Sequence, residues 1–151
     1  MRGRATMRHP LRLRQAARLI AVGSVLVGAP LQARAGTVWN WSYRNPTTKI
    51  TASGTLTTGP RAAGAYPIIA IAGVWNGAAI AGLEPIRSCC SPPGWNTNIL
   101  VDGEPRLDKG GFAFRAARGL KVNLFFKDGR YAYEIHHGPE VFGGVLVAKP
   151  R

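Results

Sequence analysis

Cysteine is almost absent from this sequence: among 151 residues only Cys89 and Cys90 occur, and they are neighbours. Adjacent Cα atoms lie about 3.8 Å apart across a trans peptide, whereas ordinary disulfides span roughly 4.4–6.8 Å, so a bridge between the two would be strained and easily reduced. With no third cysteine, an ordinary internal disulfide is excluded. An intermolecular bridge, a vicinal disulfide, a soft-metal site and an incidental pair of small loop residues all stay open.

Acidic residues are also few, with 7 Asp and Glu against 20 Lys and Arg. The first 35 residues hold seven of the arginines and no acid, so residues 36–151 carry 13 basic and 7 acidic residues, a formal charge of +6. Basic residues in this part are scattered, and the nearest to a cluster is Arg115, Arg118, Lys121, Lys127 and Arg130. The pattern is typical of a solubilising face, and we expect no nucleic-acid partner. Binding to an acidic polysaccharide or an anionic envelope surface is the alternative interpretation.

The N-terminal apolar run, Leu19–Leu31, is shorter than the roughly 20 residues that a membrane-spanning helix needs. It follows an Arg-rich segment and precedes Ala33-Arg34-Ala35, which is the three-part signature of a secretory signal. We therefore predict a signal peptide helix over residues 1–35, cleaved after Ala35, with Met1 or Met7 as the start. The leader lacks two adjacent arginines, which favours the general secretory route. The protein is then secreted or periplasmic, with no membrane span after cleavage.

Residues 36–151 contain no long stretch of helical periodicity and are enough for one domain with one core. Short apolar runs separated by turn residues predict an all-β domain. We expect strands over residues 39–43, 50–57, 66–75, 78–83, 98–101, 121–127, 130–136 and 141–148. The run 66–75 is apolar on both faces, which predicts a central strand, and 141–148 is expected at an edge. The predicted fold is an antiparallel meander that forms a small sandwich or an open barrel, between which the sequence does not choose.

The clearest local signal is a hairpin at Asp128-Gly129. Pairing outward from this turn gives a hairpin with one apolar face, which holds the pairs Phe126–Tyr131, Leu124–Tyr133 and Val122–Ile135. The opposite face has the pairs Lys127–Arg130, Asn123–Glu134 and Lys121–His136. Turn type and alternation agree on a single register, which is good evidence for the hairpin.

Residues 84–111 form a long loop rich in Pro and Gly that holds both cysteines and Trp95. Long irregular stretches in a compact domain are usually functional or disordered. Tryptophan suits stacking on sugar rings, but a small domain also needs large side chains in its core, so we expect Trp39 and Trp41 to be buried and Trp95 to be exposed. The predicted ligand-binding residues are Trp95, Asn96, Asn98 and Asp102.

A metal site is the second candidate and would join Cys89 and Cys90 to His136 and His137, with copper or zinc as the ion. Successive side chains on a strand point to opposite faces, so the two histidines do not converge unless the strand end twists. Ordinary surface histidines are the favoured interpretation.

Catalytic signatures are missing, since the sequence has no G-x-S-x-G, H-E-x-x-H or Walker motif. Asp102, Glu104 and Asp108 cluster as a glycosidase pair or a calcium site would, but Asp102-Gly103 and Asp108–Gly111 are good turns in their own right. We expect neither an enzyme nor a cofactor.

Several segments taken together resemble a group of small exported bacterial proteins, many of which carry a PEP-CTERM sorting tail. The segments are Ala52–Thr58, Gly73–Ile80, Asn98–Leu100, Pro105–Asp108 and Val122–Leu124. The resemblance covers most of residues 36–151 and implies an extracellular or cell-surface β domain, with no catalytic residues to carry over. The sequence departs from the group at Val147–Arg151, where the Pro-Glu-Pro motif and apolar tail are missing. We therefore expect free secretion or periplasmic residence.

Two functional hypotheses of different class follow. The first is a non-enzymatic exported module that interacts with envelope or extracellular polymer, such as a polysaccharide. The second is a metal-binding or redox-responsive periplasmic protein that uses the Cys-Cys and His-His pairs.

Overall fold

The computed structural model describes residues 36–90 and 95–151. The predicted signal peptide, with Ala33 and Ala35 at its cleavage site, lies outside these residues. Within the described ranges, no helix has the length and apolar character needed to cross a membrane.

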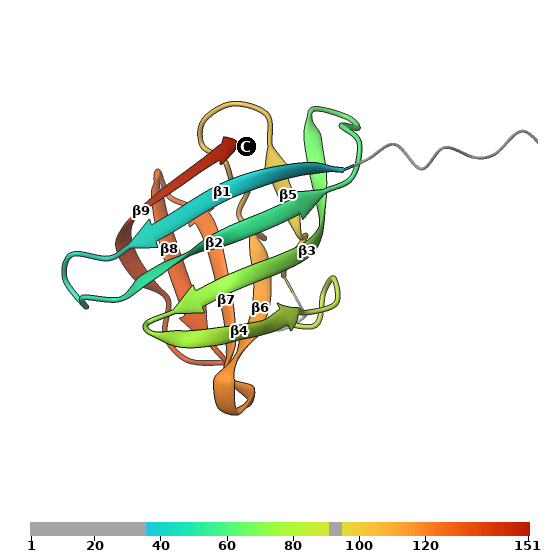
Figure 1. The fold of residues 1–151 in the computed structure, drawn as a ribbon. Coiled ribbons are helices and arrows are strands. Elements are labelled where there is room, and N and C mark those ends of the chain that lie inside the picture. The colour runs from blue at the N-terminus through green and yellow to red at the C-terminus, as the bar shows by residue number, and fades with distance from the viewer. Residues whose placement is uncertain (1–35, 91–94) are drawn as a thin grey trace, which may run out of the picture. The chain divides into compact units, whose positions relative to one another are not determined.

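The described chain is an antiparallel β-barrel (Figure 1). Its strands are β1 (Thr37–Arg44), β2 (Thr51–Thr58), β3 (Ala65–Trp75), β4 (Ala78–Leu83), β5 (Ile99–Val101), β6 (Phe112–Ala116), β7 (Lys121–Lys127), β8 (Arg130–Ile135) and β9 (Val141–Pro150), with a 3₁₀ turn, η1 (Ala117–Gly119), between β6 and β7. Eight of these strands pair in chain order, and β9 returns to β1, so the ring closes. The short strand β5 pairs with β3 beside the ring.

The predicted all-β antiparallel meander is confirmed, and of the two architectures left open the chain forms a barrel, which is closed rather than open. The prediction of an edge position for the last strand was wrong, because β9 lies between β1 and β8. As predicted, β3 has neighbours on both sides, but its outward face is uncovered, with Ile69 60 % exposed. Strand β6 was not predicted.

The predicted register of the Asp128-Gly129 hairpin is confirmed by the pairing of β7 with β8. Phe126 lies opposite Tyr131, Leu124 opposite Tyr133, and Val122 opposite Ile135. The register matters for function because it decides which side chains of β7 and β8 face the barrel interior and which face outward.

Aromatic side chains fill the barrel. Trp39 and Trp41 of β1 are buried, as the sequence predicts, and Trp75 is buried with them. The ring of Trp41 meets that of Phe112 edge-on, with 5.4 Å between centroids. Such edge-to-face contacts add to the free energy of burial, and an eight-stranded barrel is just wide enough for side chains to fill its interior.

The pairing of β2 with β3, the seam between these two strands, contains a pair of facing glycines. Gly54 lies opposite Gly73, and Trp41 lies opposite Gly54 on the other side. A Cβ at Gly73 would collide with Ser53 O and lie 2.8 Å from Gly54 Cα, and Gly73 has a φ of +143°. Only glycine allows both the close approach of the two strands and this backbone conformation.

Gly73→Ala should therefore destabilise the barrel by more than backbone strain alone. Gly82 is the matched control, since its φ of +153° is similar but a Cβ there would meet nothing within 4 Å. We expect the free energy of unfolding in urea to fall by about 1–3 kcal/mol more for Gly73→Ala than for Gly82→Ala, the usual cost of overpacking. Equal losses would show that the seam tolerates a Cβ.

Candidate functional site

The outer face of β6 and β7 is covered by the described residues of the loop, 84–90 and 95–111. Phe125 points away from the barrel interior, since Leu124 and Phe126 on either side of it pack with the main core, yet it is only 3 % exposed. Cys89, Cys90 and Ala113 form a second, small buried cluster on this outer side. The long loop is therefore docked on the barrel wall, and its docking creates the site.

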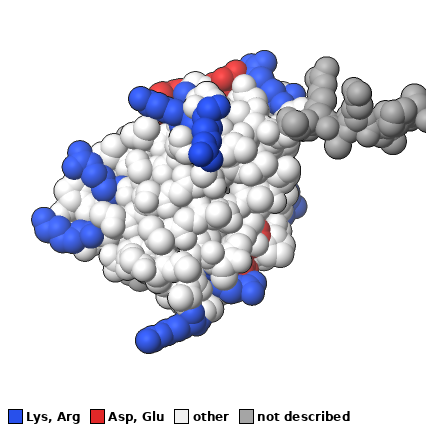
Figure 2. All heavy atoms as spheres, in the orientation of Figure 1, with Lys and Arg blue, Asp and Glu red and all other residues white. Residues whose placement is uncertain are grey.

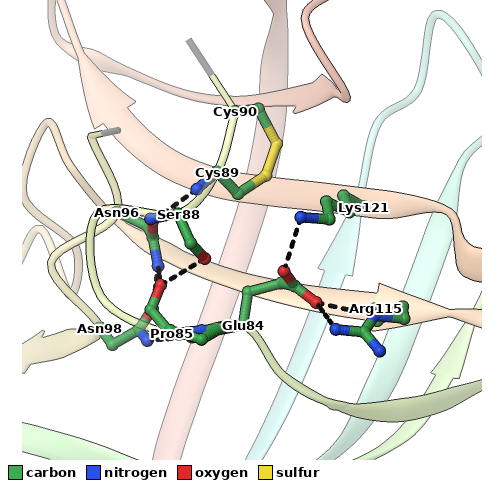
Figure 3. A network of polar contacts seen from close by, with 9 residues as sticks. All are labelled: Glu84, Pro85, Ser88, Cys89, Cys90, Asn96, Asn98, Arg115 and Lys121. Atoms are coloured by element: carbon green, nitrogen blue, oxygen red, sulfur yellow. Dashed lines mark hydrogen bonds and ion pairs between the residues drawn. A yellow bond between two sulfur atoms is a disulfide. The ribbon is translucent and has the colours of Figure 1, made fainter. Parts of the chain in front are cut away.

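Two amides hold the loop in place (Figure 3). Asn96 Oδ1 accepts hydrogen bonds from the backbone N–H groups of Ser88 (2.9 Å) and Cys89 (3.0 Å), and its Nδ2 donates to Pro85 O (2.8 Å) and to Asn98 Oδ1 (3.1 Å). Asn98 Nδ2 donates to Glu84 O at 2.7 Å, and its Oδ1 accepts from Ala113 N at 3.1 Å. Both amides are buried, and the oxygen and the nitrogen of each make hydrogen bonds within the protein, so they stabilise the fold of the loop.

A buried carboxylate anchors the start of the loop to β6 and β7 (Figure 3). Glu84 is 2 % exposed, and its carboxylate pairs with Arg115 Nη2 at 2.6 Å and with Lys121 Nζ at 3.0 Å. Burial by itself raises the pKa of Glu84, but hydrogen bonds and charges from Lys121 and Arg115 outweigh it, so the pKa lies below its ordinary value of 4.5. Two of the basic residues that looked clustered in the sequence therefore serve this carboxylate.

The far end of the loop is held by a tight turn at Asp108. Asp108 Oδ1 accepts hydrogen bonds from Gly111 N (2.7 Å), Gly110 N (3.1 Å) and Thr97 Oγ1 (2.9 Å). This is the turn chemistry expected from the sequence. It brings the backbone at Gly110 so close to Trp95 O that a Cβ at Gly110 would lie 2.5 Å from that atom, and Trp95 is placed beside the outer face of β7.

A pocket of about 210 Å³ opens at this point, between the loop and the outer face of the β7–β8 hairpin. Trp95, which is 47 % exposed, and Lys109 come from the loop, and Asn123, Phe125 and Lys127 come from β7. Two acidic residues, Glu134 of β8 and Glu140, complete the lining. The pocket thus combines an exposed indole ring with hydrogen-bonding groups of both kinds.

Charges in the pocket balance. Lys127 Nζ bonds both oxygens of Glu140 at 2.8 Å, and this hydrogen bond is the main cause of a raised pKa of Lys127, to which the charges of Glu140, Asp128 and Glu134 also contribute. The lining also contains one further basic residue, Lys109, and one further acidic residue, Glu134. The lining therefore contains two basic and two acidic residues.

One buried acceptor in the pocket lacks a hydrogen bond. Asn123 is 2 % exposed, and its Nδ2 donates to Gly110 O at 3.0 Å. Among the described residues no donor makes a hydrogen bond to its Oδ1. Leaving such a group unsatisfied costs roughly 1–3 kcal/mol, so it marks a place where a donor from a ligand would be stabilised.

Of the predicted ligand-binding residues, only Trp95 lines this pocket. The amides of Asn96 and Asn98 make hydrogen bonds that hold the loop. Asp102 pairs with Arg61 at 2.8 Å elsewhere on the surface. Sequence reasoning missed the residues contributed by the hairpin. A signal for them existed in Phe125, a large apolar side chain on the face of the hairpin that otherwise carries polar pairs.

The candidate metal residues are not brought together in the described part of the chain. Cys89 and Cys90 are joined to each other as a vicinal disulfide and are buried. A disulfide has no thiolate to offer a metal. His136 and His137 are exposed after β8, and no group of three or more metal-ligating side chains occurs among residues 36–90 and 95–151.

A second depression, of about 290 Å³, lies on the outer face of β1, β2 and β9, and its lining includes Ser42, Ser53, Val145 and Val147. Figure 2 shows the neighbouring face over β1–β3, where most Lys and Arg side chains stand at the margin of an uncharged middle. The one aromatic residue in the lining of this depression is Tyr43, which is 2 % exposed and packs in the aromatic core. The pocket at Trp95 is therefore the better candidate for a specific ligand.

Comparison with known proteins identifies no relative: no family model, no curated protein and no solved structure matches the chain.

The lowered pKa of Glu84 predicts how the stability of the protein depends on pH. Because the pKa of Glu84 is lowered on folding, its contribution to stability is fully present above its ordinary pKa of 4.5 and is lost as the pH falls through the lower, folded value. Glu84→Gln should lower the free energy of unfolding at pH 7 by roughly 1–3 kcal/mol and reduce its dependence on pH below 4.5. Urea unfolding at a series of pH values measures both.

Glu104→Gln is the control for this experiment, because Glu104 is an exposed carboxylate that pairs with Arg106 at 3.2 Å. Exposed pairs contribute little, so this variant should retain the acid dependence of the parent protein. The same acid dependence in Glu84→Gln as in the parent would contradict the assigned role of Glu84.

Proposed function

We propose that this protein is a non-enzymatic binding module of the cell exterior that holds a carbohydrate polymer of the envelope or extracellular matrix in the pocket at Trp95. The observation that carries the proposal is the exposed indole of Trp95 at the rim of a pocket whose other lining residues are the buried ring of Phe125 and a small set of polar side chains. The expected signal peptide supports an exported location, either secreted or periplasmic.

The composition of the pocket suits a sugar. A pyranose ring has one face of C–H groups, which packs on an aromatic ring, and an edge of hydroxyls, which need donors and acceptors at the same time. Trp95 offers the ring, while Lys109, Asn123 and Glu140 offer polar groups nearby. Ligand sites of this kind are mainly apolar surfaces with a few placed polar groups.

The net positive charge of residues 36–151 supports a second, unspecific attraction to acidic polymers, but this attraction is weak because most of the clustered basic residues already have partners. Four of the five basic residues nearest to a cluster have partners: Arg115 and Lys121 pair with Glu84, Lys127 pairs with Glu140, and Arg130 lies 4.7 Å from the centre of the Phe142 ring. Attraction by charge alone is screened by salt, whereas packing on Trp95 is not. Salt therefore separates the two kinds of binding.

Trp95→Ala should abolish salt-resistant binding to the target polysaccharide. The test is co-sedimentation of the purified protein with insoluble cell-wall and extracellular polysaccharides at low and high salt. Ile69→Ala is the matched control, since Ile69 is a large apolar side chain that is 60 % exposed on β3 and does not line the pocket. We expect the parent and Ile69→Ala to bind equally, and Trp95→Ala to lose at least about tenfold in affinity.

Two results would contradict the proposal. Binding that high salt removes and Trp95→Ala leaves unchanged would reduce the interaction to net charge. No binding to any polysaccharide would exclude a role in holding such polymers.

A further inference from the structure

We infer that the pocket at Trp95 selects a neutral sugar that carries an acetamido group, as N-acetylglucosamine does. The inference rests on the proposed function and names its ligand class. It follows from three properties of the lining: an unsatisfied acceptor, a buried aromatic ring next to it, and a balance of charge.

The unsatisfied acceptor of the pocket is the side-chain oxygen of Asn123. Asn123 Oδ1 is buried and accepts no hydrogen bond within the described chain, while the Nδ2 of the same amide is engaged by Gly110 O at 3.0 Å. That bond fixes the orientation of the amide, so the atom left without a partner is an acceptor. A ligand must bring a donor, and the N–H of an acetamido group is one.

Phe125 lies two residues along the same face of β7, and it also lines the pocket. An aromatic ring at this depth has no hydrogen bond to give and favours an apolar group beside the donor. The methyl of an acetamido group stands next to its N–H and carbonyl. Trp95 at the rim then remains available for the C–H face of the sugar ring.

Lys109 and Lys127 provide donors for the acetamido carbonyl, and their charges are balanced by Glu134 and Glu140. A uronic acid brings a negative charge next to two carboxylates, and an unacetylated amino sugar brings a positive charge next to two ammonium groups. Neither gains a net attraction from a lining of this kind, so a neutral ligand is favoured. The pocket volume of about 210 Å³ lies below the range of roughly 300–1,000 Å³ typical of larger ligands, which limits occupancy to about one sugar residue.

Trp95 itself reports binding. All four tryptophans lie in the described part of the chain, and Trp39, Trp41 and Trp75 are buried. A soluble quencher such as acrylamide therefore acts mainly on Trp95, and a ligand seated on its ring protects it. The probes are the β-1,4-linked trimers of N-acetylglucosamine and of glucose, which are both neutral and differ at the acetamido group.

We expect the acetylated trimer to protect Trp95 at a concentration at least about tenfold lower than the glucose trimer needs. In Asn123→Ala this preference should shrink toward equality. Because Asn123 also bonds Gly110, thermal unfolding must first show that the variant is folded. If it is not, the comparison of the two trimers on the parent protein decides alone.

Equal protection by both trimers, a preference for the glucose trimer, or protection by neither overturns the inference. The co-sedimentation experiment then tells whether the proposed function falls with it. Binding of a polysaccharide that Trp95→Ala abolishes would leave the polymer-binding proposal standing with a different sugar, whereas absence of all binding would remove both.

Discussion

Closure of the sheet is the constraint on which the rest of this structure depends. Once β9 pairs with β1 and β2 pairs with β3, each of the eight strands in the ring has a partner on both sides. No edge of the ring is left to recruit another chain, and alternate side chains must point either into the barrel or away from it. The interior is taken by aromatic rings, so any specific site has to be built on the outside.

The long loop builds that site by covering part of the wall. Its polar side chains mostly serve the loop: Asn96 and Asn98 satisfy backbone groups, and Glu84 ties its start to two basic residues. These contacts hold Trp95 beside the outward-facing residues Asn123 and Phe125 of β7. The pocket thus depends on hydrogen bonds made up to about ten residues away from Trp95.

Features that depend on interactions between residues close in the sequence could be predicted from it, whereas features that depend on contacts between distant segments could not. The hairpin at Asp128-Gly129 could be predicted with its register, because turn type and alternation are local. Strand β6 was missed because five residues after two glycines carry little periodicity, and its partners β4 and β7 decide that it is a strand. Asn96 and Asn98 were expected to bind a ligand because a loop amide has the same sequence signal whether its partner is a ligand or the backbone.

The sequence by itself determined the all-β class, the strand alternation and the exposure of Trp95, because each of these follows from the spacing of apolar side chains and from turn residues within a few positions. Only the tertiary structure decided that the barrel is closed, that the two cysteines are joined, and that Trp95 meets the outer face of a hairpin about thirty residues further along the chain. Contacts between segments so far apart depend on how the strands pair and how the loop docks, and neither leaves a local pattern in the sequence.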